Sequence, residues 1–343
     1  MIRFALIAVS VILAFDSRTG ASTYPDVAID SLLRAGIDLT LRQKYDSAQV
    51  MFRTLSNRYP AHPAGTVFQA GVLQTIAMDY EELVAENGFD SLITLSKRQA
   101  DVLIEQTPDS PWGYFFRGTA LGNEALARAQ RGDWLGGVVK AVSSATGFEE
   151  ALHKDSSLVD AYAGLGTYYY WKTRRIEFLT WLPFVSDRKV EGVRLLKLCA
   201  EKGIYNRMPA MSSLVTVYLD MAEYERAEEI ARTALAEYPD NRIFLWGLAT
   251  ALERSGKHED AVLAYSRLLA ALVNDARPNP YNELVCRLNL LQLRLATVDS
   301  QTREGEIRAI RTLLKGSFPD HLSERVKDKQ ARLAEIERVI GSQ

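Results

Sequence analysis

The sequence predicts an all-α protein, a right-handed α-solenoid of about six to seven consecutive helix pairs with a C-terminal capping helix. Three observations carry this prediction. The stretch 209–241 has the pattern of two short helices joined by a turn, a stretch near the N-terminus repeats that pattern, and the last helix is charged outside one narrow apolar stripe. Glycine and proline are also too scarce for an all-β sandwich, at 21 and 11 residues.

The stretch 209–241 shows what one unit of the array should contain. Its first helix carries bulky apolar residues at steps of three and four, which places them on one face: Met211, Leu214, Val215 and Tyr218. The second helix carries smaller residues in the same way: Ala227, Ile230, Ala231 and Ala234. Pro239 ends this helix, because proline lacks the amide that the next turn needs. Ala227 and Ala231 allow the two backbones to approach closely.

Residues 29–62 repeat this pattern 179 positions earlier. The repeat places Tyr45, Ala48, Phe52, Leu55 and Pro60 at the same offsets as Tyr224, Ala227, Ala231, Ala234 and Pro239. A bulky first-helix face, a second helix with small residues four apart and a closing proline together resemble the tetratricopeptide repeat family. The resemblance implies helix pairs that bury their apolar faces against neighbouring pairs, and a binding scaffold as the function.

The same pattern divides residues 26–341 into successive units. They are expected near 29–62, 63–108, 110–157, 158–203, 208–241, 242–274 and 281–316. In the second unit, Asn87-Gly88 predicts the break between the helices, and Ser110-Pro111 predicts the start of the third. A capping helix is expected over 322–340, where an apolar stripe on a charged helix would close the open end of the array.

Residues 1–21 predict a signal peptide. Arg3 supplies a positive start, the apolar run from Phe4 to Phe15 is too short to span a bilayer, and Thr19-Gly20-Ala21 offers small residues for cleavage after Ala21. An uncleaved anchor is the alternative. We therefore expect an exported protein, in the periplasm or cell envelope or outside the cell, with no integral membrane segment in the mature chain.

Catalytic, metal and cofactor motifs are missing from the sequence. His62, His153, His258 and His321 are scattered without metal-ligand spacing, and there is no phosphate-binding loop, dinucleotide loop or nucleophile elbow. The formal net charge of −2 argues against nucleic acid as a partner. Cys199 and Cys286 are predicted as two buried thiols. We expect no enzyme, no metal and no cofactor.

The family resemblance implies that the first helices line a concave groove, and the repeat offsets predict which side chains face it. The predicted groove residues are Trp112, Phe115, Thr119, Asn123, Asp160, Thr167, Tyr170, Ser212, Thr216, Trp246, Thr250 and Glu253. Aromatic rings beside hydroxyls, with few charges, suit an extended peptide or a sugar-like chain. The alternative is that half or more of them pack against neighbouring helices.

An insert at 176–186 interrupts the fourth unit and is rich in aromatic residues, with Trp181 added to the predicted binding residues. It could fold into the groove, dock a partner or contact a membrane surface. From the insert through Gly203 the sequence is also similar to a segment of the Iml2/TTC39 branch of helical-repeat proteins, a likeness that covers under a fifth of the chain.

These observations favour a non-enzymatic scaffold that binds a protein or peptide in the cell envelope or outside the cell. The alternative is a binding module for a small or polymeric envelope ligand, sugar-like or apolar, with the groove aromatics as stacking platforms. The sequence does not indicate the identity of the partner or the oligomeric state.

Overall fold

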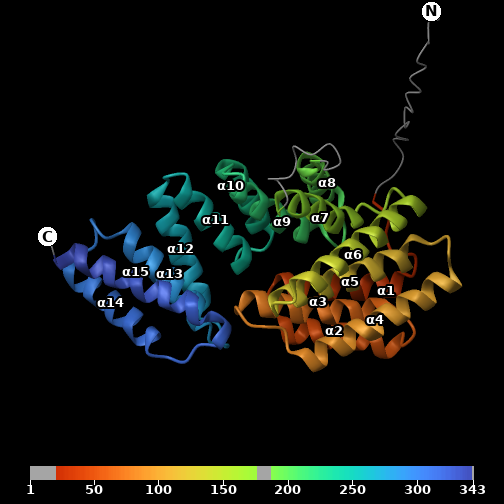
Figure 1. Cartoon of the computed structure of the whole chain (residues 1–343), viewed down its shortest axis with the longest axis horizontal. Coiled ribbons are helices and arrows are strands. Elements are labelled where there is room, and N and C mark those ends of the chain that lie inside the picture. Colours follow the sequence, from red (N-terminus) through yellow and green to blue (C-terminus); the bar gives the residue numbers. More distant parts are fainter. Residues whose placement is uncertain (1–20, 176–186, 342–343) are drawn as a thin grey trace, which may run out of the picture.

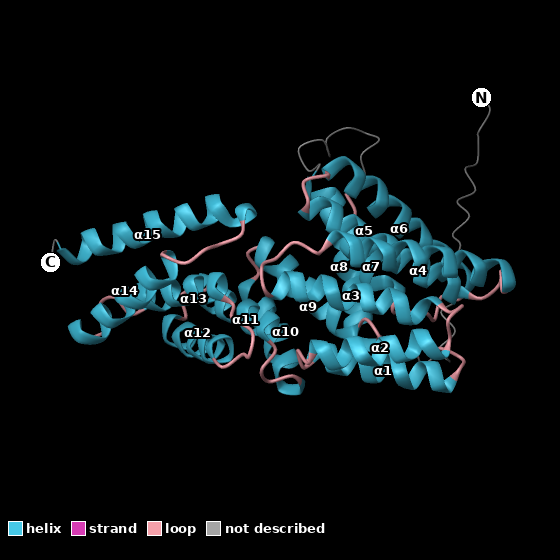
Figure 2. Cartoon of the chain, turned by 90° about the horizontal axis from the view of Figure 1, so that it is seen from below, coloured by secondary structure: helices cyan, strands magenta, loops and turns pink. Residues whose placement is uncertain are grey.

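The structure is a computed structural model that describes residues 21–175 and 187–341. Every regular element in these residues is helical (Figure 2). In chain order they are α1 (Val27–Leu41), α2 (Tyr45–Arg58), α3 (Pro63–Asp79), α4 (Glu86–Gln106), α5 (Pro111–Gln130), α6 (Trp134–Lys154), α7 (Ala161–Arg175), α8 (Lys189–Lys202), α9 (Arg207–Asp220), α10 (Tyr224–Glu237), α11 (Arg242–Arg254), α12 (His258–Val273), α13 (Pro280–Leu293), α14 (Ser300–Leu314), the short 3-10 helix η2 (Asp320–Leu322) and α15 (Ser323–Gly341).

Each helix from α1 to α14 packs against the next one along the chain, so the helices stack as consecutive hairpins (Figure 1). This confirms the prediction of an all-α solenoid of helix pairs. The break in the second unit lies earlier than predicted. Asn87 and Gly88 belong to the first turn of α4, and the chain turns between Asp79 and Glu86.

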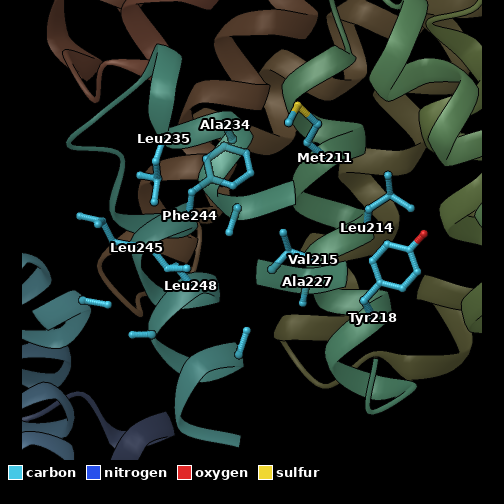
Figure 3. Packing of buried hydrophobic residues seen from close by; sticks show 14 of the residues in the cluster. Met211, Leu214, Val215, Tyr218, Ala227, Ala234, Leu235, Phe244, Leu245 and Leu248 are labelled. Atoms are coloured by element: carbon cyan, nitrogen blue, oxygen red, sulfur yellow. The ribbon is translucent and has the colours of Figure 1, made fainter. Parts of the chain in front are cut away.

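The core follows the alternation of bulky and small residues. Ala227, Ala231 and Ala234 on α10 are fully buried, and Figure 3 shows α10 between the bulky side chains of α9 and α11. Met211, Leu214 and Tyr218 come from α9, and Phe244 and Leu245 from α11. One pair therefore buries its apolar face only when its neighbours are present, as the repeat pattern predicts.

Several helices begin after a residue whose side chain caps the free amides of the first turn. Asp26 caps α1 by accepting hydrogen bonds from the amides of Ala28 and Ile29, at 2.9 and 3.1 Å. Asn241 caps α11 in the same way through the amides of Ile243 and Phe244. These caps fix where each hairpin starts and thereby its register against its neighbours.

The first helix also contacts units far along the chain, a feature that the repeat pattern does not predict. We call these contacts the α1 seam. Along α1 and the residue after it, Asp30 accepts from the Tyr205 hydroxyl, the Leu41 carbonyl accepts from Asn241 at 2.8 Å, and Arg42 lies over the Tyr238 ring. Of these partners, Tyr205 lies just before α9, Tyr238 just after α10 and Asn241 just before α11. The first unit therefore contacts the fifth unit and the segment that precedes it.

A buried polar cluster extends this contact between the two parts of the array. We call it the closure cluster. The Arg242 guanidinium, at the start of α11, forms ion pairs with Asp79 at the end of α3 and with Asp275 after α12. Tyr45 donates to Asp79 at 2.8 Å, and Asn279 donates to the Asp79 carbonyl at 2.7 Å. The array thus curls until its second unit touches its sixth and seventh.

The turn after α3 completes the closure on the surface. Glu81 forms an ion pair with Arg325 on α15, and its carbonyl oxygen lies 2.8 Å from the His321 imidazole. Glu82 pairs with Arg277 at 2.6 Å. The helix α15 therefore covers the last hairpin and also contacts the second unit.

Candidate functional site

Three of the predicted groove aromatics are core residues. Trp112 is 3% exposed, and its ring lies edge-on to Tyr24 at 5.1 Å and to Tyr205 at 5.8 Å. Phe115 and Tyr170 are both 1% exposed, and the Tyr170 hydroxyl donates to Asp220 at 2.6 Å. These side chains are packed in the interior, so they offer no surface on which a ligand could stack.

The polar groove residues lie nearer the surface. Thr119, Asn123, Thr167 and Thr250 are half-buried, and Thr216 is exposed. Three of the threonine hydroxyls donate to the carbonyl four residues earlier in their own helix, which leaves an oxygen lone pair available: Thr119, Thr167 and Thr216. Trp246 is half-buried, edge-on to Tyr265 at 6.0 Å. Trp181 lies outside the described residues.

Two acidic groove residues have structural partners. Asp160 is fully buried and accepts from the amides of Ile204, Tyr205 and Asn206 at 2.6–3.0 Å, which fixes the turn before α9. Burial nevertheless raises the pKa of Asp160 above its usual value, against the lowering effect of these amides. Glu253 accepts from the Tyr265 hydroxyl at 2.6 Å. Both acids are therefore engaged within the fold, and the predicted groove residues lie on or next to four helices, α5, α7, α9 and α11.

Several large apolar side chains of the described residues are exposed together on one face of α6, which we call the α6 stripe. It consists of Trp134, Leu135, Val138, Val139 and Val142, with exposed fractions between 46% and 85%. These positions follow one another at helical spacing along two turns of the same face. Between Trp134 and Phe148 the only charged residue is Lys140, and its ammonium group pairs with Glu124 at 3.3 Å. Contiguous apolar surfaces of this kind mark interaction sites more often than isolated exposed residues do.

The opposite side of α6 explains why this stripe is left exposed. Ser144, Ala145, Gly147, Phe148 and Ala151 are buried against α5 and α7. The Ser144 hydroxyl donates to the Gly118 carbonyl at 2.7 Å, so the α5–α6 contact is close and polar at that point. At the N-terminal end of the stripe, the Arg175 guanidinium lies 5.3 Å from the Trp134 ring centre. Because the packing face of α6 is already occupied, the stripe is available to a partner.

The closure cluster has the burial and the perturbed acids of an active site, but its groups are paired with one another. Burial and a hydrogen bond to Asp275 raise the pKa of Tyr80 to about 12. Burial opposes ionisation of Asp275, yet bonds from the Arg277 amide, Tyr80 and Arg242 hold its pKa below the usual value. The Asp79 carboxylate has Arg242, Tyr45 and Gln43 as partners. The acidic groups of the cluster are thus engaged with one another's partners, and these contacts hold α3 against α11 and the segment after α12.

Neither a metal site nor a membrane span is found in the described part of the chain. No group of three or more histidine, cysteine or acidic side chains in residues 21–175 and 187–341 could hold a metal ion. Within the same residues, no helix has the length and hydropathy to cross a bilayer. Cys199 and Cys286 are free buried thiols, and burial raises the pKa of Cys286 to about 12, so neither is a reactive thiolate.

Comparison with known proteins agrees with the repeat pattern. Residues 213–279 match the family model described as tetratricopeptide repeat. No curated protein matches the chain.

Among solved structures, a thermophilic TPR protein of Thermus thermophilus is similar, with 17% identity and a TM-score of 0.43, covering 65% of this chain and 98% of that one. The C-terminal part of a TPR repeat-containing protein from Cytophaga hutchinsonii has 14% identity and a TM-score of 0.45, covering 87% and 98%. A tetratricopeptide repeat protein from Parabacteroides merdae has 13% identity and a TM-score of 0.39, covering 90% and 99%.

Proposed function

Because this chain is a tetratricopeptide-repeat protein, we propose that it is a non-enzymatic scaffold that binds a protein partner outside the cytoplasm, in the cell envelope or beyond it. The observation that carries the proposal is the α6 stripe, five large apolar side chains exposed on one helix face, while α6 packs on its neighbours through Gly137 and through the residues that follow the stripe. Burying them would add a favourable free energy of about 25 cal/mol for each Å² of apolar area removed from water.

The partner that fits the stripe best is an amphipathic helix. The stripe runs along the helix axis for two turns and is bounded at one end by Arg175 over the Trp134 ring. A helix laid alongside α6 would continue the side-by-side packing of the array, with its own apolar residues at steps of three and four. An acidic residue near its end would suit Arg175. This surface differs from the concave groove that the sequence predicts.

Photocrosslinking tests this proposal directly. A photoreactive residue at Leu135 should crosslink a defined protein, and the same residue at Leu263, which is 69% exposed but isolated on α12, should not. Val138→Lys should abolish the crosslink at Leu135 while leaving the melting temperature within about 2 °C, since surface substitutions change stability little. Equal crosslinking at both positions, or none at Leu135, would show that the stripe is not the docking surface.

The export part of the proposal rests on the N-terminal sequence pattern. Cleavage after Ala21 would leave Ser22 as the first residue, and mass spectrometry of the protein recovered from an envelope fraction would show it. An Ile12→Lys variant should retain the precursor in the cytoplasm, because a charge breaks the apolar run. Recovery of an uncleaved chain from the cytoplasm of wild-type cells would contradict export.

A second candidate function, binding of a small or polymeric ligand by the groove aromatics, has weaker support. Of the aromatic platforms expected among the described residues, Trp112 and Tyr170 are buried and Trp246 alone is half-buried. A Trp246→Ala variant separates the two functions. It should leave crosslinking at Leu135 unchanged if the α6 stripe carries the partner, and should weaken capture if the groove does.

A further inference from the structure

A cleft of about 400 Å³ lies among α12, α13 and α14, away from both the α6 stripe and the predicted groove residues. Its apolar wall consists of side chains from α12 and α13 and from the turn that follows α13: Leu269, Ala270, Val273, Leu290, Leu291 and Val298. Polar side chains stand around it, chiefly Arg287, Arg294, Arg303 and Glu306. The volume falls within the range of pockets that bind small organic molecules, roughly 300–1,000 Å³.

The cleft exists because α14 turns its apolar face elsewhere. Ile310 of α14 is buried with Leu284 and Leu288 of α13 and with Leu333 and Ile336 of α15. The first half of α14, which carries Thr302, Arg303 and Glu306, consequently faces α12 across a gap. Below the gap lie Leu290, 7% exposed, and Leu291, so its floor is apolar and already in place without a ligand.

The arginines around the cleft differ in how they are paired. Arg287 is neutralised by Glu283 at 2.8 Å and Glu306 at 2.9 Å. The guanidinium groups of Arg294 and Arg303 make no hydrogen bond or ion pair with any other residue in the described ranges. Three arginines and one glutamate give the lining a formal charge of +2, whereas the whole chain carries −2. The cleft is thus a local positive site beside an apolar floor.

We propose that this cleft binds an aliphatic carboxylate, a small organic acid with a hydrocarbon chain. The planar guanidinium groups of Arg294 and Arg303 match a carboxylate, to which arginine forms paired charge-assisted hydrogen bonds. The hydrocarbon chain lies on Leu269, Val273 and Leu290, where its burial removes apolar surface from water. A fully polar anion would leave the apolar floor of the cleft exposed to water. An uncharged hydrocarbon would leave both arginines without a carboxylate partner.

Titration calorimetry of the full mature chain with decanoate, kept below its micelle concentration, tests the proposal. Binding should be saturable at one site. In the double variant Arg294→Gln/Arg303→Gln it should weaken at least tenfold, since each hydrogen bond between charged groups contributes about 1.5–3 kcal/mol. The matched control is Arg308→Gln on the same helix, whose guanidinium is 69% exposed and faces Glu304. Its affinity for decanoate should equal that of the wild type.

Three further ligands, acetate, decanol and decyl phosphate, test which chemical groups the cleft recognises. Acetate, which lacks the chain, and decanol, which lacks the charge, should each bind far more weakly than decanoate. Val273→Asp, on the exposed rim, should weaken decanoate without unfolding the protein. No saturable decanoate binding, binding unchanged in the double variant, or tighter binding of decyl phosphate than of decanoate would each overturn the assignment. None of these results bears on crosslinking at Leu135, so the two proposals stand or fall separately.

Discussion

Single residues at the turns inside the helix pairs adopt the left-handed backbone conformation. Gly256 has φ 77° and Ala222 has φ 57°, at the same place in successive units. An L-residue in this region costs about 1–2 kcal/mol, because its Cβ approaches the following carbonyl oxygen. The backbone at Ala222 therefore carries this strain energy, whereas Gly256, which has no Cβ, does not.

Gly256→Ala should destabilise the protein by about 1 kcal/mol, because the strain is in the backbone and nothing lies within 4 Å of the added Cβ. The midpoint of urea unfolding measures the loss. The reverse change, Ala222→Gly, is the matched control and should leave stability unchanged or slightly higher. A gain in stability at Gly256→Ala would contradict the left-handed turn.

His62 gives the protein a dependence on pH. Its imidazole lies 2.6 Å from the Tyr24 hydroxyl and edge-on to Phe116, and burial lowers its pKa from 6.5 to about 4. The unfolded chain therefore takes up this proton near pH 6.5 and the folded chain only near pH 4. The stability that this residue contributes is present above pH 6.5 and is lost as the pH falls towards 4, by at most about 3 kcal/mol.

The free energy of unfolding, measured between pH 7 and pH 5, should fall for the wild type. His62→Asn should flatten this fall, because asparagine does not titrate in this range. Asparagine can still cap α3, as the imidazole does through the Ala64 amide. Other titrating groups, including Asp160 with its raised pKa, are the same in both proteins, so they cancel in the comparison. A slope between pH 7 and 5 that is the same in both proteins would exclude His62 as its cause.

At the scale of elements, the spacing of small residues could be predicted from the sequence and the exposed face of α6 could not. Ala227 and Ala231 stand at the positions of Ala48 and Phe52, and all four are buried, although the small residue of that pattern is replaced by a phenylalanine at position 52. On α6, apolar residues occur on both faces, so periodicity alone does not tell which face packs. Only the positions of α5 and α7 decide that Ala145 and Phe148 are buried while Val138 and Val139 remain exposed.

A close helix contact joins α7 and α8 at two glycines. A Cβ on Gly166 would lie 2.7 Å from the Gly192 carbonyl oxygen and 3.1 Å from the Leu196 amide nitrogen. Backbone atoms cannot move aside cheaply, so Gly166→Ala should separate the helices and cost about 1–3 kcal/mol, as overpacked sites do. Thermal unfolding would show the loss.

Gly305→Ala is the control for that substitution. Gly305 lies inside α14 with nothing within 4 Å of its added Cβ, so alanine should raise stability by about 0.5–1 kcal/mol through helix propensity. If both alanine variants changed the melting temperature in the same direction, the close α7–α8 approach would not be the reason for the glycine at 166.

At the scale of the whole molecule, the closure cluster joins the two parts of the array. The side chains of Arg242 and Asp79 are 7% and 3% exposed. Arg242→Ala would leave the Asp79 carboxylate buried without its guanidinium, and the expected loss of stability is about 3–5 kcal/mol. Chemical denaturation measures it, and small-angle scattering should show a longer particle where the protein remains folded.

Arg308→Ala is the comparison for this variant, because the pair Arg308 and Glu304 is about 70% exposed on both sides. Exposed pairs contribute about 0–1 kcal/mol, so that variant should keep nearly its full stability. A similar, small effect of both substitutions would mean that the closure cluster does not hold the two parts together.

The repeat pattern predicted the hairpins because each one depends on its neighbours in the chain, and neighbours leave a periodic signal. The closure cluster joins Asp79 to Arg242 across 163 residues, and no periodicity connects such positions. The same limit applies to the predicted groove. Trp112 is buried by Tyr24 and Tyr205, which the α1 seam brings together, so its burial depends on the curvature of the whole array. Sequence offsets predict on which face of a helix a residue lies, but they do not predict the curvature of the array.

The α1 seam also bears on how the protein is made. Its first helix leaves the ribosome, and on our proposal the export channel, long before Tyr205, Tyr238 and Asn241 exist to receive it. An ordinary helical array can assemble from one end as it emerges. Here α1 gains its seam contacts only after residues 205–241 have been made. Until then α1 would be open to proteases or chaperones, and the folding of residues 205–241 would be the event that shelters it.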